Sequence, residues 1–252
     1  MSTGRPLNVL VTGGSGPSGI AAARALRHAG HTVFTVGSDG PRIEAAAAEA
    51  GSGVTPLVCD LADLAEVRSL HTAVHARLAG TGGSVDGVIH LVGGWRGAKG
   101  ITDQSDEDWE FLERGAITTL RNVTRVFYDD LAASDAGRFA MVSSTAAAKP
   151  TAGGASYAAA KAAAEAWTLA LADGFQASQS GRKEDPVEQR SAAVVFVVKA
   201  LVDAAMRAKS PERRFPGFTD VEDLAAAAVG LFTSPAAELN GRRILLGPEP
   251  KP

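Results

Sequence analysis

Short apolar runs alternate along this chain with longer stretches that look helical. Such runs, bounded by glycine or polar residues, indicate buried strands, and their alternation with helices favours a parallel sheet with right-handed crossovers. The expected strands cover residues 7–12, 31–36, 54–59, 85–92, 138–144, 191–198 and 242–246. The pattern predicts an α/β fold in which residues 1–252 form one Rossmann-like domain, a doubly wound parallel sheet flanked by helices.

Two helices are expected in the middle of the chain. Residues 105–131 open with acidic side chains and read as one long helix. An Ala-rich run of helix formers contains Tyr157 and is expected to continue as a helix to about Phe175. Residues 176–190 are polar, charged and interrupted by glycine and proline, which predicts a surface loop.

Two further segments are assigned near the end of the chain. Residues 199–218 mix charged and aromatic side chains after a strand, and we expect them to form a mobile lid over a substrate. Thr219 is expected to cap a last helix that runs through Phe232, because acidic residues follow it in the first turn.

Composition excludes several classes of function. The chain has 252 residues, 45% of them hydrophobic and 21% charged, which is ordinary for a soluble globular protein. A formal net charge of -3 gives no electrostatic reason to expect a nucleic acid or an anionic membrane as partner. No apolar run reaches the length of a membrane span, and residues 1–6 are too short and polar for a signal peptide. The expected setting is cytoplasmic.

Metal and disulfide chemistry are not expected. Cys59 is the single cysteine, so it forms neither an internal disulfide nor a cysteine-based metal cluster. His71 and His75 lie four residues apart, a spacing that can chelate a metal. The sequence shows no third ligand near them, so a solvated helix face and no metal site are predicted.

A glycine-rich turn follows the first strand and precedes a helical stretch. Strand, turn and helix in this order direct backbone N–H groups and the positive end of a helix toward a pyrophosphate. The residues expected to bind a dinucleotide there are Gly13, Ser15, Gly16, Ser18 and Gly19. Pro17 offers no N–H, so one possible phosphate donor is missing, although proline is well tolerated in the first turn of a helix.

The end of the second strand is where such folds distinguish NAD from NADP. An acidic residue there would bind the ribose 2'-OH, and an arginine would bind a 2'-phosphate. Gly37 and Ser38 occupy these positions, and Arg42 lies one helical turn further on. The missing carboxylate and the Ser38 hydroxyl favour NADP as cofactor, whereas an inward-turned Asp39 would favour NAD.

The predicted chemistry is concentrated in residues 143–161. Ser144 ends an apolar strand, and Tyr157 and Lys161, four residues apart, lie on one face of the helix that follows. A phenol with a pKa of about 10 holds its proton too tightly for exchange at neutral pH, but a nearby ammonium and a helix N-terminus favour the phenolate. These residues therefore predict proton exchange with a substrate oxygen, which the Ser144 hydroxyl would orient.

Ser144, Tyr157 and Lys161, with the serine thirteen positions before the tyrosine and a glycine-rich turn after the first strand, resemble the short-chain dehydrogenase/reductase family. The similarity runs from about Leu7 to Leu246. It implies an oxidoreductase that transfers a hydride between a nicotinamide dinucleotide and a small carbonyl or alcohol substrate. In that family the tyrosine is the general acid/base, the serine positions the substrate oxygen, and the lysine lowers the tyrosine pKa and binds the nicotinamide ribose.

The resemblance implies further contacts. Asp60 follows the third strand where the family's aspartate contacts the adenine ring, although it could instead cap a helix that begins near Asp63. Gly93, after the fourth strand, is expected to let the backbone pass close to the nicotinamide. Trp95 could stack on a substrate ring or serve as hydrophobic cover. Relatives commonly pair through the two long helices, which implies a homodimer or homotetramer.

Several positions depart from the family pattern. They are Pro17, His90, Ala116 and Lys199, where the family usually has glycine, asparagine, a catalytic asparagine and proline. The loop that begins at Val92 is more similar to that of the dihydropteridine reductase branch, which also lacks the catalytic asparagine. These departures leave open an alternative, a dinucleotide-binding sensor or scaffold subunit without redox turnover. A cofactor-free acid/base enzyme is a third interpretation.

Overall fold

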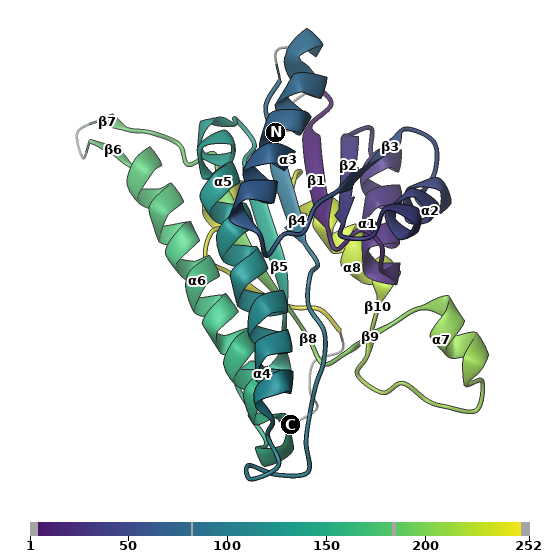
Figure 1. Cartoon of the computed structure of the whole chain (residues 1–252). Helices are drawn as coiled ribbons and strands as arrows, with labels where there is room; N and C mark the ends of the chain where they lie inside the picture. Colours follow the sequence, from purple (N-terminus) through teal and green to yellow (C-terminus); the bar gives the residue numbers. More distant parts are fainter. Residues whose placement is uncertain (1–4, 82, 183–184, 248–252) are drawn as a thin grey trace.

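A parallel sheet of seven strands is the centre of the computed structural model, which describes residues 5–81, 83–182 and 185–247. The strands are β1 (Asn8–Thr12), β2 (Thr32–Gly37), β3 (Val54–Val58), β4 (Gly87–His90), β5 (Arg138–Ser144), β8 (Ala192–Val198) and β11 (Arg243–Leu245). Their order across the sheet is β11-β8-β5-β4-β1-β2-β3, so the direction of winding reverses between β1 and β4 (Figure 1). The predicted fold class is confirmed.

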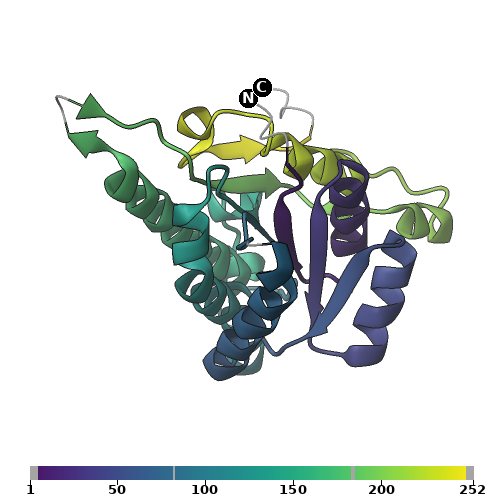
Figure 2. The same ribbon diagram turned by 90° about the horizontal axis from the view of Figure 1, so that it is seen from above.

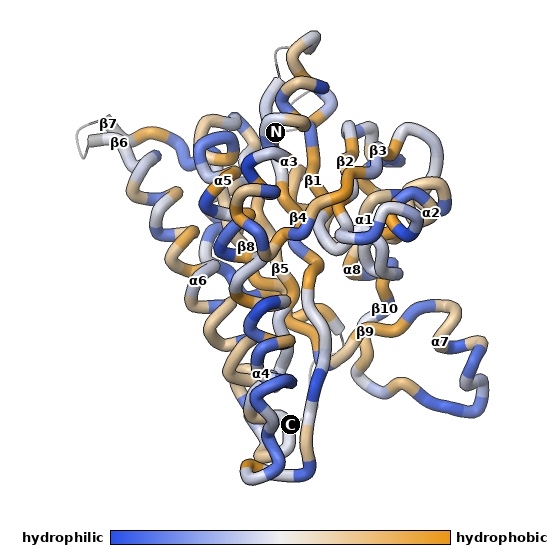
Figure 3. The backbone as a smooth tube through the Cα atoms, in the orientation of Figure 1, coloured by the Kyte–Doolittle hydropathy of each residue, from blue (hydrophilic) through white to orange (hydrophobic). Residues whose placement is uncertain are grey.

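Helices cover both faces of the sheet (Figure 2). On one face lie α1 (Pro17–His28), α2 (Gly40–Ala50), α8 (Val221–Gly230) and the short α9 (Ala236–Leu239). On the other lie α3 (Leu64–Leu78), α5 (Thr119–Ala133) and α6 (Ala155–Gln179). The central strands are buried on both faces, which explains why they are nearly continuous apolar runs in the sequence (Figure 3).

The topology places the functional residues at one edge of the sheet. All neighbouring strand pairs of this sheet are parallel, so their carboxyl ends lie on the same side. In open α/β sheets, ligands bind outside the carboxyl ends of the strands, at the point where the winding reverses. The loops after β1, β4 and β5 therefore meet where a ligand would bind.

The helix predicted over residues 105–131 is interrupted. It consists of α4 (Asp106–Glu113), a π-helical turn η2 (Arg114–Thr118) and α5, which ends two residues later than predicted. Gly115 lies in this turn and weakens helical preference, and the Thr119 hydroxyl donates to the Gly115 carbonyl at 2.7 Å. A single π-helical turn widens the backbone locally and is frequent at functional sites.

Part of the segment predicted as a surface loop, residues 176–190, has regular secondary structure. Helix α6 continues to Gln179, beyond the predicted end at Phe175, and the strands β6 (Gly181–Arg182) and β7 (Asp185–Pro186) pair antiparallel. Residues 183 and 184 lie outside the described residues. The buried Gln179 amide donates to Ala132 O and Ser191 Oγ, and these distant partners could not be read from a polar sequence.

Residues 199–218 form an excursion whose two ends are joined. Strand β9 (Leu201–Val202) pairs with β10 (Thr219–Asp220), and between them α7 (Ala204–Lys209) stands apart from the rest of the fold (Figure 1). This arrangement suits the predicted lid, which stays a prediction.

The cap of the last long helix differs from the prediction. Asp220, not Thr219, caps α8, because its carboxylate accepts from the Glu222 N–H at 3.1 Å. The Thr219 hydroxyl instead donates to the Leu246 carbonyl, and α8 ends at Gly230 rather than Phe232. Among the described residues, no helix combines the length and the apolar character needed to cross a membrane.

Candidate active site

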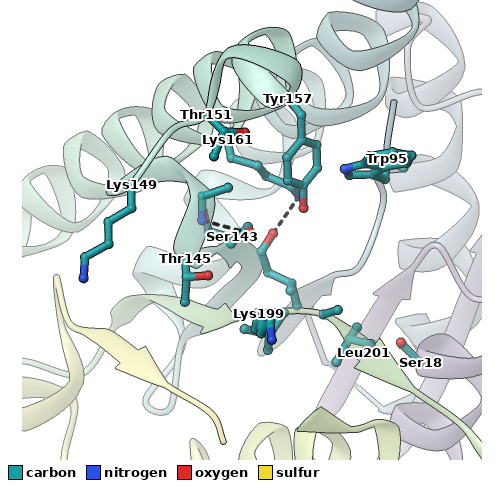
Figure 4. A pocket seen from close by; sticks show the side chains of 18 of the residues that line it. Ser18, Trp95, Ser143, Thr145, Lys149, Thr151, Tyr157, Lys161, Lys199 and Leu201 are labelled. Atoms are coloured by element: carbon teal, nitrogen blue, oxygen red, sulfur yellow. Dashed lines mark hydrogen bonds between the residues drawn. The ribbon is translucent and has the colours of Figure 1, made fainter. Parts of the chain in front are cut away.

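A cleft of about 820 Å³ opens at the carboxyl edge of the sheet (Figure 4). It collects side chains and backbone from segments far apart in the sequence. The lining includes Ser18, Gly93, Trp95, Ser144, Tyr157, Lys161 and Lys199. The three predicted catalytic residues thus share one cavity with Ser18 and Gly93, two further residues predicted to bind the cofactor.

The glycine-rich turn is tightly packed behind this cleft. Gly13 has a φ of 73°, and a Cβ added there would lie 2.7 Å from the Leu91 carbonyl carbon. A Cβ at Gly19 would lie 2.5 Å from the Gly13 oxygen. Both positions require glycine, because the turn lies too close to the start of α1 and to the residues that follow β4 to leave room for a side chain.

The start of α1 fits a phosphate group. Gly16 is the N-cap of α1 and has no side chain that could accept a hydrogen bond. The N-cap residue therefore leaves the first N–H groups of the helix available to an anion. Pro17 stands at the first helical position, where its missing N–H costs little. Ser18 lines the cleft one residue further on.

An orphaned hydroxyl supports the same ligand. Ser15 Oγ is buried and makes no hydrogen bond, and a Cβ at Gly37 would lie 2.5 Å from it. Buried hydroxyls are nearly always hydrogen-bonded. The Ser15 hydroxyl, at the junction of the turn and β2, is therefore expected to form a hydrogen bond with a polar group of a ligand. The residues present at this turn therefore fit the phosphates of a dinucleotide.

The end of β2 does not present a free carboxylate toward this junction. Asp39 caps α2, because its Oδ1 accepts from the Arg42 N–H at 2.9 Å. Ser38 and Arg42 are exposed. Within the described ranges, no hydrogen bond or ion pair engages the Arg42 guanidinium. Ser38 and Arg42 are thus available to an anionic group, whereas Asp39 is held by the helix.

Asp60 is not a helix cap, so that alternative is wrong. The N-cap of α3 is Asp63, whose Oδ1 accepts from the N–H groups of Ala65 and Glu66. The Asp60 carboxylate forms an ion pair with Arg114, which lies in the π-helical turn η2. Its predicted contact with the adenine ring stays a prediction.

His90 has a structural role. It is buried in β4, where its Nδ1 lies 2.7 Å from Thr12 Oγ1 and its Nε2 lies 3.2 Å from Thr119 Oγ1. Burial, with a smaller effect of the Lys161 charge, lowers the pKa of His90 to about 3, so the imidazole is neutral. The ring joins β1, β4 and α5 behind the cleft, which accounts for this departure from the family pattern.

The backbone bend at Ala116 is present without an asparagine. Ala116 lies within η2, and its side chain has no polar atom to relay a proton. The widened turn is instead accompanied by the Thr119 hydrogen bond and by the Arg114 ion pair with Asp60. The widened helical turn at Ala116 is therefore accompanied by contacts of Thr119 and Arg114, in place of those that the family's asparagine makes.

Ser144, Tyr157 and Lys161 converge from β5 and α6. The Tyr157 and Ser144 hydroxyls form a hydrogen bond. The Lys161 Nζ donates to the Val142 carbonyl at 2.8 Å and lies 6.0 Å from the Tyr157 ring centroid. A Cβ added at Gly93 would lie 3.3 Å from the same nitrogen, which shows how closely the loop after β4 approaches it.

The protonation of Tyr157 differs from the expectation. Burial raises the pKa of its phenol, while the hydrogen bond with Ser144 opposes this and lowers it. The expected lowering by Lys161 is not what decides the pKa here, because desolvation of the phenolate outweighs the favourable contacts. In this environment the phenol holds its proton at neutral pH and can act as a general acid.

Lys161 is itself perturbed. It is 7% exposed, and burial lowers the pKa of its ammonium to about 8, although the Glu165 carboxylate opposes the shift. The ammonium is therefore mainly charged below that pH and mainly neutral above it. Because this pKa lies close to neutral pH, small changes in the surroundings of Lys161 alter the fraction of the side chain that is charged.

A buried network behind Lys161 was not predicted. Glu165 lies one helical turn after Lys161, accepts from Ser143 Oγ at 2.5 Å and pairs with Arg243 Nε at 2.7 Å. The i,i+4 spacing of Lys161 and Glu165 was a signal available in the sequence. The contribution of Arg243 was not, because β11 reaches this position only through the sheet.

Trp95 and Lys199 also line the cleft. Trp95 is 67% exposed, so it does not serve as hydrophobic cover, and its ring borders the cleft (Figure 4). Lys199, where the family usually has proline, donates to the Pro216 carbonyl at 3.0 Å. That bond ties the base of the segment 199–218 to its returning end.

Known proteins share this sequence and fold. Residues 7–179 match the family model of the short chain dehydrogenases. The chain belongs to this family. Nodulation protein G of Rhizobium meliloti (strain 1021) is 31% identical over 160 residues, a match that covers 64% of this chain and 62% of that protein. Nodulation protein G of Rhizobium sp. (strain N33) is 28% identical over 96% of this chain and 95% of its own.

Solved structures of other proteins have the same fold. An NADPH-bound short chain oxidoreductase from Pseudomonas aeruginosa PAO1, described as containing an atypical catalytic center, has a TM-score of 0.79 and 20% identity, with 95% of each chain covered. An NAD+-bound xylitol dehydrogenase has a TM-score of 0.75 and 17% identity, with 96% of this chain and 97% of that one covered. At this identity the likeness shows the fold.

Proposed function

We propose that this chain transfers a hydride between a nicotinamide dinucleotide and a small carbonyl or alcohol substrate. The observation that carries the proposal is the meeting of Ser144, Tyr157 and Lys161 in one cleft. The same cleft is bordered by Ser18, next to the glycine-rich turn. Family membership supports dehydrogenase or reductase chemistry in general.

Each residue would have a distinct role. When bound, the nicotinamide would accept or supply the hydride at the substrate carbon. Tyr157 would donate its proton to the carbonyl oxygen during reduction and accept it during oxidation. Ser144 would orient that oxygen through its hydroxyl, and the Lys161 ammonium would stabilise negative charge that develops on the Tyr157 oxygen.

The test is hydride transfer with purified protein. Oxidation of NADPH and NADH is followed by absorbance with a panel of ketones, quinones and quinonoid pterins. Turnover of one class supports the proposal. The alternative, a dinucleotide-binding sensor or scaffold subunit, predicts cofactor binding with no turnover of any compound in either direction. A buried phenol beside Ser144 and Lys161 would serve no purpose in that alternative.

We further propose NADP as the preferred cofactor. NADPH is expected to bind more tightly than NADH in a fluorescence titration, because Ser38 and Arg42 are available to a 2'-phosphate while Asp39 caps α2. The variant Arg42→Ser should weaken NADPH binding about tenfold or more, because it removes a charge-assisted hydrogen bond to the 2'-phosphate. It should leave NADH binding unchanged.

The control for this titration is Arg68→Ser, which removes an exposed arginine on α3. It should bind both dinucleotides as the unmodified protein does. Tighter binding of NADH than of NADPH, or an equal effect of Arg42→Ser on both, would contradict the assignment.

A further inference from the structure

Three potential metal ligands meet on the outer side of helices α3 and α5. His71 and His75 project from α3, and Asp130 lies near the end of α5. Asp130 Oδ2 lies 2.8 Å from His75 Nε2 and 3.3 Å from His71 Nε2. The sequence offered only the histidine pair, and the packing of α5 beside α3 adds the third group.

The distances suit a single ion. Zinc binds imidazole nitrogen and carboxylate oxygen at about 2.0–2.2 Å, so neighbouring ligands in a tetrahedral site lie about 3.3 Å apart. The three ligand atoms lie within 4.8 Å of one another. The His71–Asp130 distance already has the required value, and His75 and Asp130 would separate by only about 0.5 Å.

Histidines four residues apart on a helix form a recognised chelating pair. They present their rings on one face, and here the ring centroids of His71 and His75 lie 4.2 Å apart. The His71 ring also packs edge-on against Phe127, with centroids 5.2 Å apart, which restricts its rotation. A pair held in this way loses little conformational freedom when it binds an ion.

The cluster can be reached from solvent. The side chains of His71 and His75 are 31% and 35% exposed, and that of Asp130 is 11% exposed. Three protein ligands leave one position of a tetrahedral ion for water or another small donor. Two imidazoles and one carboxylate favour zinc or a neighbouring late transition metal over magnesium or calcium, which prefer oxygen ligands alone.

The cluster is separate from the catalytic cleft. Helices α3 and α5 run from the carboxyl edge of the sheet toward its amino edge, and His71 lies in the middle of α3, His75 and Asp130 in the second half of their helices. None of them lines the cleft. An ion here would join α3 to α5 and leave proton transfer at Tyr157 unaffected.

We propose that His71, His75 and Asp130 form a zinc-binding site that links helices α3 and α5. The ion would bind the folded chain, in which the three groups are brought together, and would therefore raise the melting temperature as its concentration increases. This inference does not depend on the proposed oxidoreductase activity.

The experiment uses the full chain without an affinity tag, stripped of metal with a chelator and then dialysed. Zinc chloride is titrated in a calorimeter, and cobalt chloride is titrated in parallel as an absorbing substitute. One ion should bind per chain, with the cobalt absorption of a four-coordinate site. His75→Ala and Asp130→Asn should each weaken binding at least about tenfold, since the loss of even an outer-shell partner costs 10–100-fold.

The control variant is His28→Ala, which removes an exposed histidine at the end of α1. It should keep the binding of the unmodified protein, and circular dichroism should show that all variants are folded. Zinc should raise the melting temperature of the unmodified protein and of His28→Ala, and not that of His75→Ala. The proposal is overturned by the absence of saturable binding to the unmodified protein. It is equally overturned if folded His75→Ala and Asp130→Asn bind as tightly as His28→Ala.

Discussion

Replacement of Tyr157 by phenylalanine is expected to lower the rate of carbonyl reduction by about 10²–10⁴-fold, the usual contribution of a positioned general acid. The phenol is buried, hydrogen-bonded to Ser144 and kept protonated by a raised pKa. Phenylalanine retains the ring and removes only the hydroxyl, so NADPH affinity should change little. Steady-state rates and a fluorescence titration on the same preparation measure both quantities.

Tyr128→Phe is a matched control for this experiment. Tyr128 is the other tyrosine of the chain and lies on α5, where its ring stacks on Phe175 with centroids 5.3 Å apart. It does not line the cleft, so its variant should keep normal turnover. Unchanged turnover in Tyr157→Phe, or an equal loss in both variants, would refute the role of the phenol.

Replacement of Lys161 by methionine is expected to lower carbonyl reduction by at least about 10²-fold and to weaken dinucleotide binding. Methionine preserves the length and apolar character of the buried stem, so the fold should be retained. The variant removes the ammonium that donates to Val142 O and lies close to Gly93, beside the expected nicotinamide. Rate measurements and cofactor titrations check the two effects separately.

The same residue predicts a pH dependence. Burial lowers the pKa of Lys161 to about 8, so its positive charge is present below that pH and is lost above it. A nearby positive charge favours the phenolate that Tyr157 forms when it donates its proton, so the rate of reduction should fall as the pH rises through about 8. The residual activity of Lys161→Met should lack this fall.

Lys149→Met provides the comparison for both measurements. Lys149 borders the same cleft but is exposed at its rim. Its variant should keep the rate, the affinity and the alkaline fall of the unmodified protein. If the alkaline fall persists in Lys161→Met, another group is responsible for it and the assignment to Lys161 is wrong.

Much of the fold could be predicted because local patterns are sufficient for it. The seven strands of the large sheet were located within a few residues, since strands buried on both faces leave a continuous hydrophobic signature. The predicted helix boundaries were wrong where contacts with distant residues determine the end of a helix. Helix α6 continues to Gln179 because that side chain finds partners at Ala132 and Ser191, which no window of local sequence contains.

The proximity of the proposed catalytic residues could also be predicted. The order and spacing of Ser144, Tyr157 and Lys161 indicated one site, and the cleft brings them together. The direction of the Tyr157 pKa shift was predicted wrongly, because it depends on how much water the surrounding chain excludes from the phenol. The His90 departure likewise looked like a defect in the sequence and is a buried, neutral link between strands and a helix.

The sequence by itself determined the parallel α/β class, the glycine-rich turn and the spacing of the proposed catalytic residues, because hydrophobic period, backbone freedom and spacing along a helix are local properties. Only the tertiary structure decided which groups from distant segments become neighbours. It paired Glu165 with Arg243 and placed Asp130 against two histidines. Such contacts depend on how helices and strands pack against one another. Packing determines how far each ionisable side chain is removed from water and how close it lies to its partners, and these two factors set its pKa.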